Sequence, residues 1–509
     1  MELNEATMIF FFLLLTLLLH FARSRRDRNS TELPSTPPSP PFKLPVIGHM
    51  HLIGSQLPHV SLRDLAAKHG PDVMLIHLGA VPTLVVSSPR AAKAVLRTHD
   101  LAFASRPRSM LTDIIMYGAS DSCFAPYGDH FRKARKAVTV HLLSSKKVQS
   151  YRPVREEEVR LVLAKLRHHA AAPVDMSQLL QSFANDLICR TISGKFFCEE
   201  GRNEVFRDLV AANNALLGGF NLEAYFPGLA RMRLISKLVG GRAMRVRRRW
   251  DQLLDNLIDD HLAIRLARTH DDDQHDTDFI DVLLSRQEEY GFHRDTIKAL
   301  LIDMFEAGTD TTHLVLEYAM VELIRKPHVL AKLQDEVRSI TPKGQDAVTE
   351  DDIVDMVYLK AVIKETLRLH PPGGLTIPHL AREDCAIVDG SYMIPAGTCV
   401  IINLWALNRH ADYWDMPDEF MPGRFMDGIN KGTNFQGQYF HFLPFGSGRR
   451  MCTGIHSATI TLQIMLANLM YCFNWKLPSG MKEEDVDTTD VFGLAIHRKE
   501  KLFLVPQVA

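Results

Sequence analysis

The sequence lacks the features that define several large classes of protein. Its 509 residues contain only seven cysteines, and no two of them are spaced as C-x-x-C. A disulfide framework is therefore not predicted, and a reducing compartment is favoured. The formal net charge is −1, so no excess of positive charge indicates nucleic acid as a partner. Neither an internal repeat nor a G-x-G-x-x-G nucleotide-binding motif is evident.

A nearly unbroken apolar run, Met8–Leu19, stands close to the N-terminus and is extended by His20, Phe21 and Ala22. About 15 residues is shorter than the ~20 of a typical membrane span, and a cleaved signal peptide is the alternative. Acidic residues precede the run, arginines follow it, and no A-x-A-like cleavage site comes before the arginines. We therefore expect residues 1–22 to be a retained membrane anchor, with the rest of the chain on the cytoplasmic side.

A proline-rich strip follows the apolar run, and such a strip is extended and cannot join a helix. Residues 23–54 are predicted to form a basic, proline-rich hinge, with a disordered linker as the alternative. Residues 55–509 show no break in composition and mostly helical periodicity. We predict one large domain, mainly α with a small β portion (α+β). The expected helices are 89–99, 132–148, 151–170, 176–193, 203–217, 240–268, 276–289, 295–325, 327–339 and 455–471, and the expected strands are 73–78, 83–87, 385–387, 398–402 and a hairpin within 486–506.

One cysteine occupies a bend rich in glycine and arginine near the C-terminus. The run Phe445–Gly454 reads F-G-S-G-R-R-M-C-T-G and opens the last long predicted helix. Its glycines let the backbone approach a flat ligand closely, and the amides and helix start favour a thiolate on Cys452. A buried structural cysteine after a turn is the simpler alternative. Because no second cysteine or histidine ligand is near, the bend instead suits an axial thiolate ligand of haem iron.

An acid and an alcohol stand side by side in the middle of a long predicted helix. The segment Ala307–Thr312 reads A-G-T-D-T-T. A glycine inside a helix costs about 1 kcal/mol relative to alanine, and adjacent hydroxyls compete for backbone carbonyls and bend helices. A helix that opens a groove for a small diatomic ligand benefits from both effects. We expect Asp310 and Thr311 to deliver protons during oxygen activation.

Three patterns in the same chain resemble those of the cytochrome P-450 monooxygenases. The third pattern is Glu365 and Arg368 in E-x-x-R spacing, which alone predicts only a surface ion pair worth about 0.2–0.5 kcal/mol. The haem-thiolate signature F-x-x-G-x-R-x-C-x-G is met in full by Phe445, Gly448, Arg450, Cys452 and Gly454. The resemblance covers nearly the whole chain. It is strongest to microsomal plant enzymes, in particular the grass hydroxylases of indole-derived intermediates of benzoxazinoid synthesis.

The resemblance implies roles for individual residues and a place in the cell. It implies haem b as the cofactor, Cys452 as its iron ligand, and a single-pass protein of the endoplasmic reticulum membrane with a cytosolic catalytic domain. It places Arg424 with Glu365 and Arg368 in a buried network that holds the cysteine bend. The other haem-binding residues that it implies are Arg135, His379, Phe445, Gly448 and Arg450, and the substrate-binding residues are Ala307, Leu375, Ile377 and Phe492.

Several positions depart from the expected pattern. Phe131 stands where tryptophan is usual, so the indole N–H is missing, and Gly423 replaces the usual acid before the network arginine. His379 replaces an arginine that binds a haem propionate, and a histidine there donates one hydrogen bond with a charge that depends on pH. Asp303 and Glu306 are acids in an otherwise apolar pocket lining, where loop amides or solvent are alternatives to the substrate as their partners.

We expect a haem-thiolate monooxygenase that hydroxylates a small, largely apolar specialised metabolite, with an indole-derived compound as the narrower expectation. Its other partners are O₂, the membrane and an NADPH-dependent cytochrome P-450 reductase, whose acidic surface a basic cluster would attract. That cluster consists of Arg132, Lys133, Arg135, Lys136, Lys146 and Lys147, with Arg449 and Arg450 nearby. The alternatives are a haem-thiolate isomerase or dehydratase that does not use O₂, a haem sensor without turnover, and a terpenoid or phenolic oxidase of the same family. Enzymes of the first kind tend to lose the alcohol that Thr311 retains.

Overall fold

The computed structural model describes residues 35–53, 57–194, 202–218, 222–230, 233–267 and 278–509. The predicted anchor, residues 1–22, and the first part of the predicted hinge lie outside these ranges. Among the residues described, none of the helices combines the length and the apolar character that crossing a bilayer requires.

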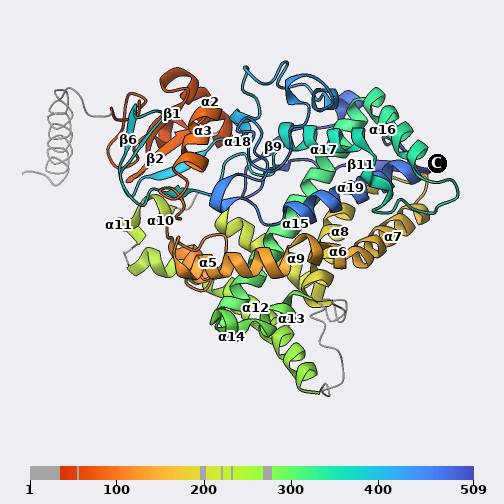
Figure 1. Ribbon diagram of the computed structural model, residues 1–509, viewed down its shortest axis with the longest axis horizontal. Helices are drawn as coiled ribbons and strands as arrows, with labels where there is room; N and C mark the ends of the chain where they lie inside the picture. Colours follow the sequence, from red (N-terminus) through yellow and green to blue (C-terminus); the bar gives the residue numbers. More distant parts are fainter. Residues whose placement is uncertain (1–34, 54–56, 195–201, 219–221, 231–232, 268–277) are drawn as a thin grey trace, which may run out of the picture.

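Helices make up most of the molecule, as predicted (Figure 1). Up to residue 230 they are α2 (Pro58–His69), α3 (Pro89–Lys93), α4 (Met110–Ile115), α5 (Asp129–Lys136), α6 (Ser145–Ser150), α7 (Arg152–His168), α8 (Met176–Ser193), α9 (Arg202–Leu217), α10 (Leu222–Tyr225) and α11 (Pro227–Ala230). The later ones are α12 (Arg233–Ala267), α13 (Phe279–Ser285), α14 (Gln287–Tyr290), α15 (Arg294–Arg325), α16 (Pro327–Ile340), α17 (Val357–Leu369), α18 (Leu404–Leu407) and α19 (Ile455–Cys472). Short π-helical stretches, Ala94–Thr98 and Ala137–Leu142, continue α3 and α5.

The strands form small sheets, and the largest lies beside α2 and α3 at one end of the molecule (Figure 1). Its strands are, in spatial order, β1 (Val73–Leu78), β2 (Val81–Val86), β7 (Cys399–Ile402) and β4 (His379–Leu380). Only the β2–β7 pair is parallel, with Leu84 opposite Val400. The other sheets contain β5 (Cys385–Ile387) with β6 (Tyr392–Ile394), β3 (Val174–Asp175) and β8 (Phe473–Lys476) on either side of β11 (Phe503–Val508), and β9 (Asp490–Val491) with β10 (His497–Arg498).

The hairpin predicted within residues 486–506 is only partly correct. β9 and β10 pair over two residues each, but β11 pairs with β8 and β3 instead of folding back on its neighbour. The reason is burial: Leu502 and Leu504 join the same apolar core as Phe473 of β8. The last strand therefore packs against the helical core instead of completing the predicted hairpin.

α15 runs through the middle of the helical body and packs against α8, α17 and α19 (Figure 1). It ends at Arg325 because Pro327 opens the next helix. Between Thr296 and Ile324 its residues are buried or half-buried except for Ala307 and Thr311. These two residues are four apart and so share one face of the helix. An opening therefore reaches the centre of an otherwise enclosed helix.

Gly308 allows α8 to approach α15 closely. A Cβ atom at this position would lie 2.7 Å from Cδ1 of Ile188. The structure thus gives the mid-helix glycine a packing role in addition to the predicted role in opening a groove. Its cost in helix propensity is offset by close contact between two core helices.

Candidate active site

The cysteine bend is a tight turn held by its own backbone. Gly448 has φ +68°, and a Cβ there would lie 2.3 Å from the carbonyl oxygen of Leu96, so only glycine fits without displacement. The Cys452 amide donates to the Phe445 carbonyl at 2.8 Å, and the Gly454 amide donates to Sγ of Cys452 at 3.3 Å. Cys452 is exposed even though the core helix α19 begins three residues later.

The surroundings of the Cys452 thiol act on its pKa in opposite directions. The protein atoms packed around the Cys452 thiol shield it from water and raise its pKa, although its sulfur side is open, whereas the Gly454 N–H and the Arg135 guanidinium lower the pKa. The predicted amide contact is therefore present, but the loss of water is the largest influence and the pKa stays above its ordinary value. A fully formed thiolate needs a further positive charge at the sulfur, and a coordinated metal ion supplies one.

Three arginines, of which Arg106 is buried and Arg135 and Arg450 are half-buried, lie together next to the bend, and we call them the arginine cluster. Their side chains donate to main-chain carbonyls: Arg106 to Pro378 at 3.0 Å, Arg135 to Met451, and Arg450 to Ala125 at 2.5 Å. No carboxylate of the described residues pairs with any of the three, and Arg449 beside them pairs with Asp100 instead. Burial, and then repulsion by Arg106, lower the pKa of Arg450 to about 9.

Two of the departures from the family pattern border the arginine cluster. The Arg450 guanidinium carbon lies 3.7 Å from the ring centre of Phe131, so the guanidinium group makes a cation–π contact with this ring. His379 is buried, and its Nδ1 lies 2.9 Å from the Phe103 carbonyl oxygen. A carbonyl only accepts, so Nδ1 carries the proton. Burial and the nearby Arg106 lower the pKa of His379 to about 3, which keeps its ring neutral at physiological pH.

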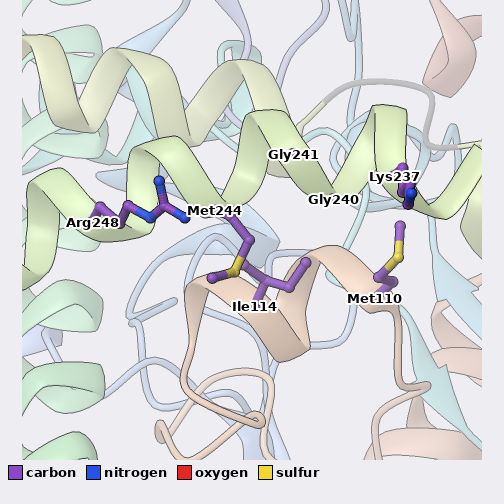
Figure 2. Close-up of a pocket in the computed structure, with 7 residues that line it drawn as sticks. All are labelled: Met110, Ile114, Lys237, Gly240, Gly241, Met244 and Arg248. Atoms are coloured by element: carbon purple, nitrogen blue, oxygen red, sulfur yellow. The ribbon is translucent and has the colours of Figure 1, made fainter.

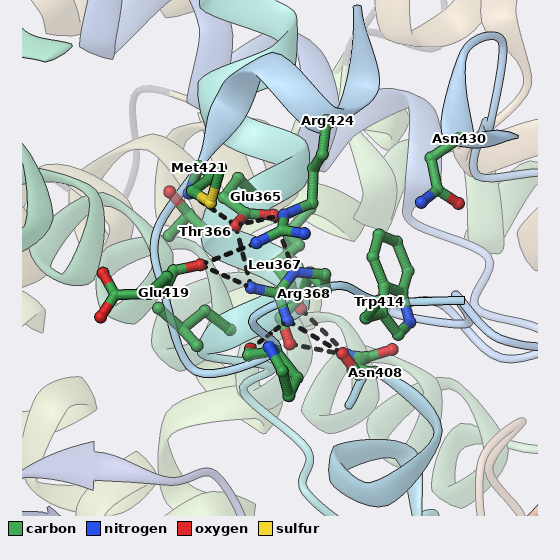
Figure 3. A network of polar contacts seen from close by, with 12 residues as sticks. Glu365, Thr366, Leu367, Arg368, Asn408, Trp414, Glu419, Met421, Arg424 and Asn430 are labelled. Carbon is green, nitrogen blue, oxygen red and sulfur yellow. Dashed lines mark hydrogen bonds and ion pairs between the residues drawn. The ribbon is translucent and has the colours of Figure 1, made fainter. Parts of the chain in front are cut away.

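A second charge group, the Glu365 network, joins α17 to the loop that precedes the bend (Figure 3). Arg368 donates to both carboxylate oxygens of Glu365, at 2.7 and 2.9 Å, and Arg424 donates to one of them at 3.0 Å. The Met421 amide donates to the same carboxylate at 2.8 Å. Arg368 also donates to the carbonyls of Asn408, Pro417 and Glu419. The structure thus brings the three predicted network residues together, and Gly423 does not prevent the Arg424 contact.

The acid–alcohol pair lies where α15 is open. The Thr311 hydroxyl donates to the Ala307 carbonyl at 2.6 Å, which leaves its oxygen free to accept. Asp310 is half-buried, and the Asn214 amide of α9 donates to its carboxylate. Burial raises the pKa of Asp310 to about 6, against a weaker opposing influence of His497. Asp310 can therefore gain and lose a proton near neutral pH.

The two acids that the sequence left unassigned have different surroundings. Asp303 accepts from the Ser122 amide at 2.7 Å and from the Ser122 hydroxyl at 2.8 Å, so it holds the loop before α5. Both carboxylate oxygens of Glu306 are buried without a hydrogen bond. Asp303 thus has the loop-amide partner that was one alternative, whereas the carboxylate oxygens of Glu306 meet neither a loop amide nor solvent.

The predicted substrate-binding residues come from three segments. Ala307 is open on α15, Leu375 and Ile377 are half-buried before β4, and Phe492 is exposed with its ring 6.3 Å from that of His59. A separate cavity of about 420 Å³ lies between α4 and α12, lined by Met110, Ile114, Lys237, Gly240, Gly241, Met244 and Arg248 (Figure 2). It contains none of Ala307, Leu375, Ile377 and Phe492, and none of the residues predicted to bind haem.

Sequence patterns missed several residues of the site. Arg106 completes the arginine cluster, Asn214 holds Asp310, and Asp121 accepts from the amides of Cys123 and Phe124. None of these residues stands in a motif or at a diagnostic spacing. Their partners lie far away in the chain, apart from those of Asp121, so a pattern of neighbouring residues carries no signal for them.

The geometry defines a class of protein. An open cysteine in a rigid bend lies beside an arginine cluster that forms no direct ion pair within the described residues, although the Asp121 carboxyl is near enough to act on Arg106 and Arg450. The bend and the cluster fit a porphyrin with an iron atom and two propionates. An open, hydroxyl-bearing stretch of α15 supplies the second face of such a site. These are the parts of a haem-thiolate enzyme.

Comparisons with known proteins agree. The sequence profile of the cytochrome P-450 family matches residues 37–505. Indole-2-monooxygenase from Zea mays is 58% identical, over 98% of this chain and 95% of that protein. Indolin-2-one monooxygenase from Zea mays is 48% identical, over 96% of this chain and 91% of that protein. A solved zebra fish cytochrome P-450 with progesterone has the same fold, with a TM-score of 0.75 and 23% identity over 89% of this chain and 100% of that one.

The chain therefore belongs to the cytochrome P-450 family. It is a haem-thiolate monooxygenase with haem b as its cofactor, and it uses a small-molecule substrate, O₂ and a redox partner. The predicted class of enzyme, its cofactor and its likeness to the grass enzymes are confirmed.

Proposed function

We propose that this enzyme hydroxylates a small indole-derived metabolite and that Cys452 is the ligand of its haem iron. The observation that carries the substrate class is the likeness, over almost the whole chain, to enzymes named for indole and indolin-2-one. The mostly apolar candidate lining suits a compact aromatic compound. An isomerase or dehydratase is disfavoured because the Thr311 hydroxyl is present and open.

Each part of the site has a distinct task in this proposal. Haem, when bound, supplies the oxygen-activating chemistry. The thiol of Cys452 binds the iron as a thiolate, and the arginine cluster neutralises the two propionates. The Thr311 oxygen accepts a hydrogen bond from water in the opening of α15, and Asp310 passes protons to that water. The Glu365 network fixes the loop that carries the cysteine.

The ligand and the substrate class are tested together. Purified enzyme with a cytochrome P-450 reductase, NADPH and O₂ should convert indole or an indolin-2-one into a product one oxygen atom heavier. Cys452→His should abolish the ferrous–carbon monoxide band near 450 nm that marks thiolate ligation. If the band survives in that variant, another residue holds the iron. If neither compound shifts the haem spin state or is oxidised, the substrate class is wrong while the ligand assignment stands.

The role of Thr311 in proton delivery is tested by removing its hydroxyl group. Thr311→Ala should keep its haem and its substrate affinity but divert electrons to hydrogen peroxide. Positioned proton transfer contributes typically 10²–10⁴-fold to a rate, so product per NADPH should fall steeply. The measurement is product formed per NADPH consumed at equal haem content. Wild-type coupling in this variant would remove the hydroxyl from the proposed path.

We further propose that the redox partner is the NADPH-dependent cytochrome P-450 reductase and that it docks on the basic cluster around α5. Tyr127 lies beneath both Arg132 and Arg449, with guanidinium-to-ring distances of 5.8 and 5.9 Å. The cations of α5 and Arg449 of the cysteine bend therefore form one continuous basic surface. Lys133→Glu should raise the reductase concentration needed for half-maximal turnover, whereas Lys343→Glu, an exposed change beyond the end of α16, should not. Equal effects of the two substitutions would contradict this docking surface.

The proposed membrane of residence is the endoplasmic reticulum, with residues 1–22 as a single anchor, residues 23–54 as a hinge and the domain 55–509 in the cytosol. The support is the apolar run followed by arginines. Protease added to sealed microsomes should digest the domain, and detergent should not be required. Protection of the domain would reverse the proposed orientation, and a mature N-terminus near Ala22 would show cleavage.

A further inference from the structure

The turn before α5 is built around a single buried acid. Asp121 is 0% exposed, and its Oδ1 accepts from the amides of Cys123 at 2.7 Å, of Phe124, and of Ala125 at 3.3 Å. Aspartate side chains order turns in this way, by accepting from the backbone that follows them. One oxygen atom here gathers three successive N–H groups and so fixes the peptide groups to which they belong. We call residues 121–125 the Asp121 turn.

The carbonyls of the Asp121 turn hold two members of the arginine cluster. The Cys123 carbonyl accepts from Nε of Arg106 at 3.1 Å and from Nη1 of Arg450 at 3.3 Å. The Ala125 carbonyl accepts from Nη2 of Arg450 at 2.5 Å. The acceptors that place these two guanidinium groups therefore belong to a segment whose orientation Asp121 sets.

One peptide group connects the acid with both arginines. The Cys123 carbonyl and the Phe124 N–H belong to the same trans peptide group and point in opposite directions. The N–H faces the Asp121 carboxylate, and the C=O faces the guanidinium groups of Arg106 and Arg450. The dipole of this peptide is thus aligned between an anion and two cations, and hydrogen bonds in such a chain polarise and strengthen one another.

Arg450 keeps donors for a ligand while the turn holds it. A guanidinium group has five N–H donors. In the part of the chain that the structure describes, the carbonyls of Ala104, Cys123 and Ala125 accept from one each. Two N–H groups are left, one on each Nη atom, and they suffice for a contact with a carboxylate.

We propose that Asp121 is a positioning residue of the haem site, which aims the Cys123 and Ala125 carbonyls and thereby sets Arg106 and Arg450 where they meet the propionates. The inference rests on the task proposed for the arginine cluster, because Asp121 acts through it. No bond is made or broken by Asp121, and its contribution is the fixed direction of two carbonyl groups.

A general role in folding is the competing role for Asp121. Asp303 of α15 already fastens the turn, since it accepts from the amide and the hydroxyl of Ser122 at 2.7 and 2.8 Å. That contact places the turn against α15, whereas Asp121 determines which way the peptide groups of the turn face. A change at Asp121 should therefore alter the retention of propionates before it alters the fold.

The charge of Asp121 and its positioning role act on a propionate in opposite directions. The carboxyl acts to raise the pKa of Arg106 and of Arg450, although burial has the larger effect and lowers both. A negative charge also repels a propionate, whereas the ordered turn holds the groups that bind one. A test of positioning must therefore compare variants of equal charge.

The test compares two neutral variants, Asp121→Asn and Asp121→Ala. Only asparagine keeps an oxygen that accepts from the three amides. Loss of haem to an acceptor protein should be about tenfold faster from Asp121→Ala than from Asp121→Asn, the low end of the effect of partners that orient a binding group. Haem dimethyl ester has no propionate charge, and the two variants should lose it at similar rates. A tenfold difference with the ester as well would make Asp121 a support of the fold and overturn the proposal.

A second measurement shows whether the effect passes through Arg450. Effects of residues that act through one another are not additive. In the background of Arg450→Met, the difference between Asp121→Ala and Asp121→Asn should therefore fall well below tenfold. A full tenfold difference in that background would contradict the proposed link.

The outcomes also separate the inference from the function on which it rests. If Arg450→Met loses haem at the wild-type rate, the task proposed for the arginine cluster fails. If Arg450→Met loses haem faster but the two Asp121 variants are alike, the cluster keeps its task and the positioning role of Asp121 is wrong. Should Asp121→Ala not fold, Asp121→Ser takes its place, because a hydroxyl accepts from turn amides more weakly. Equal rates of haem loss from Asp121→Ser and Asp121→Asn would then overturn the proposal.

Discussion

The Glu365 network and the arginine cluster are both groups of charge enclosed beside the cysteine bend, but the chain supplies an ion-pair counterion only to the first. In the network two guanidinium groups share one carboxylate, and the remaining donors reach loop carbonyls. In the cluster three guanidinium groups reach carbonyls alone, and burial lowers the pKa of Arg450 to about 9. We call the network the matched set, because one carboxylate pairs with both of its guanidinium groups. We call the cluster the unmatched set, because no carboxylate of the described residues forms an ion pair with it and a ligand of opposite charge can do so. Burial alone therefore does not distinguish a structural charge from a binding charge, and the presence of an internal counterion does.

The largest effect should come from breaking the matched set. Glu365→Gln leaves two buried guanidinium groups without their counterion, and Glu365 itself is 0% exposed. Such a loss typically costs about 3–5 kcal/mol. The free energy of unfolding should fall by that amount, and the yield of haem-loaded enzyme should fall with it. Asp351→Asn, which removes an exposed ion pair with Arg152, is the control and should change nothing measurable. Equal stability of the two variants would show that the network is not structural.

Asp310 is a half-buried acid, and its effect on stability can be tested by changing the pH. The pKa of Asp310 is about 6 because of burial, so the folded protein keeps a proton that the unfolded chain releases above about pH 4. The stability that Asp310 contributes is present below that value and is lost as pH rises through about 6, by roughly 2–3 kcal/mol in all. The unfolding free energies of wild type and Asp310→Asn should therefore diverge as pH increases, to the disadvantage of wild type. A difference that is independent of pH would mean that Asp310 ionises normally.

The smallest effect should come from a substitution in the arginine cluster, and the quantity that changes should be the rate at which the enzyme loses haem. Arg450→Met should accelerate the loss of haem to an acceptor protein by about tenfold, since a hydrogen bond to a charged group is worth about 1.5–3 kcal/mol. Haem dimethyl ester has no propionate charge, so with it the variant and the wild type should lose haem at more similar rates. If the ester leaves the tenfold difference intact, Arg450 stabilises the bend and not the propionates.

Local periodicity was enough to predict most helices. α15 and α16 have their expected limits because Pro327 separates two apolar repeats, and α19 follows the glycine bend as expected. Strand partners were less predictable, because pairing joins residues far apart in the chain. The run 398–402 was expected to be a strand, but no pattern indicates that Leu84 lies opposite Val400.

The residues of the candidate site also fall into two groups, those that a sequence pattern predicts and those that only the fold brings together. Residues that carry a motif, such as Cys452, Asp310 and Glu365, were found from spacing. Arg106 and Asn214 were not, because their importance comes from groups that the fold brings to them across long stretches of chain. The open position of Ala307 and Thr311 also depends on the whole helical body, since an exposed residue inside a buried helix leaves no trace in helical periodicity.

The contact between Gly308 and Ile188 has a consequence for sequence variation. A Cβ at position 308 would come within 2.7 Å of the tip of the isoleucine side chain, so space for one residue exists only at the expense of the other. The two positions are therefore expected to vary together among related enzymes, with a larger residue at 308 appearing beside a smaller one at 188. The size of that pair, more than the identity of either member, sets how closely the helix that bears Asp310 and Thr311 is held to its neighbour.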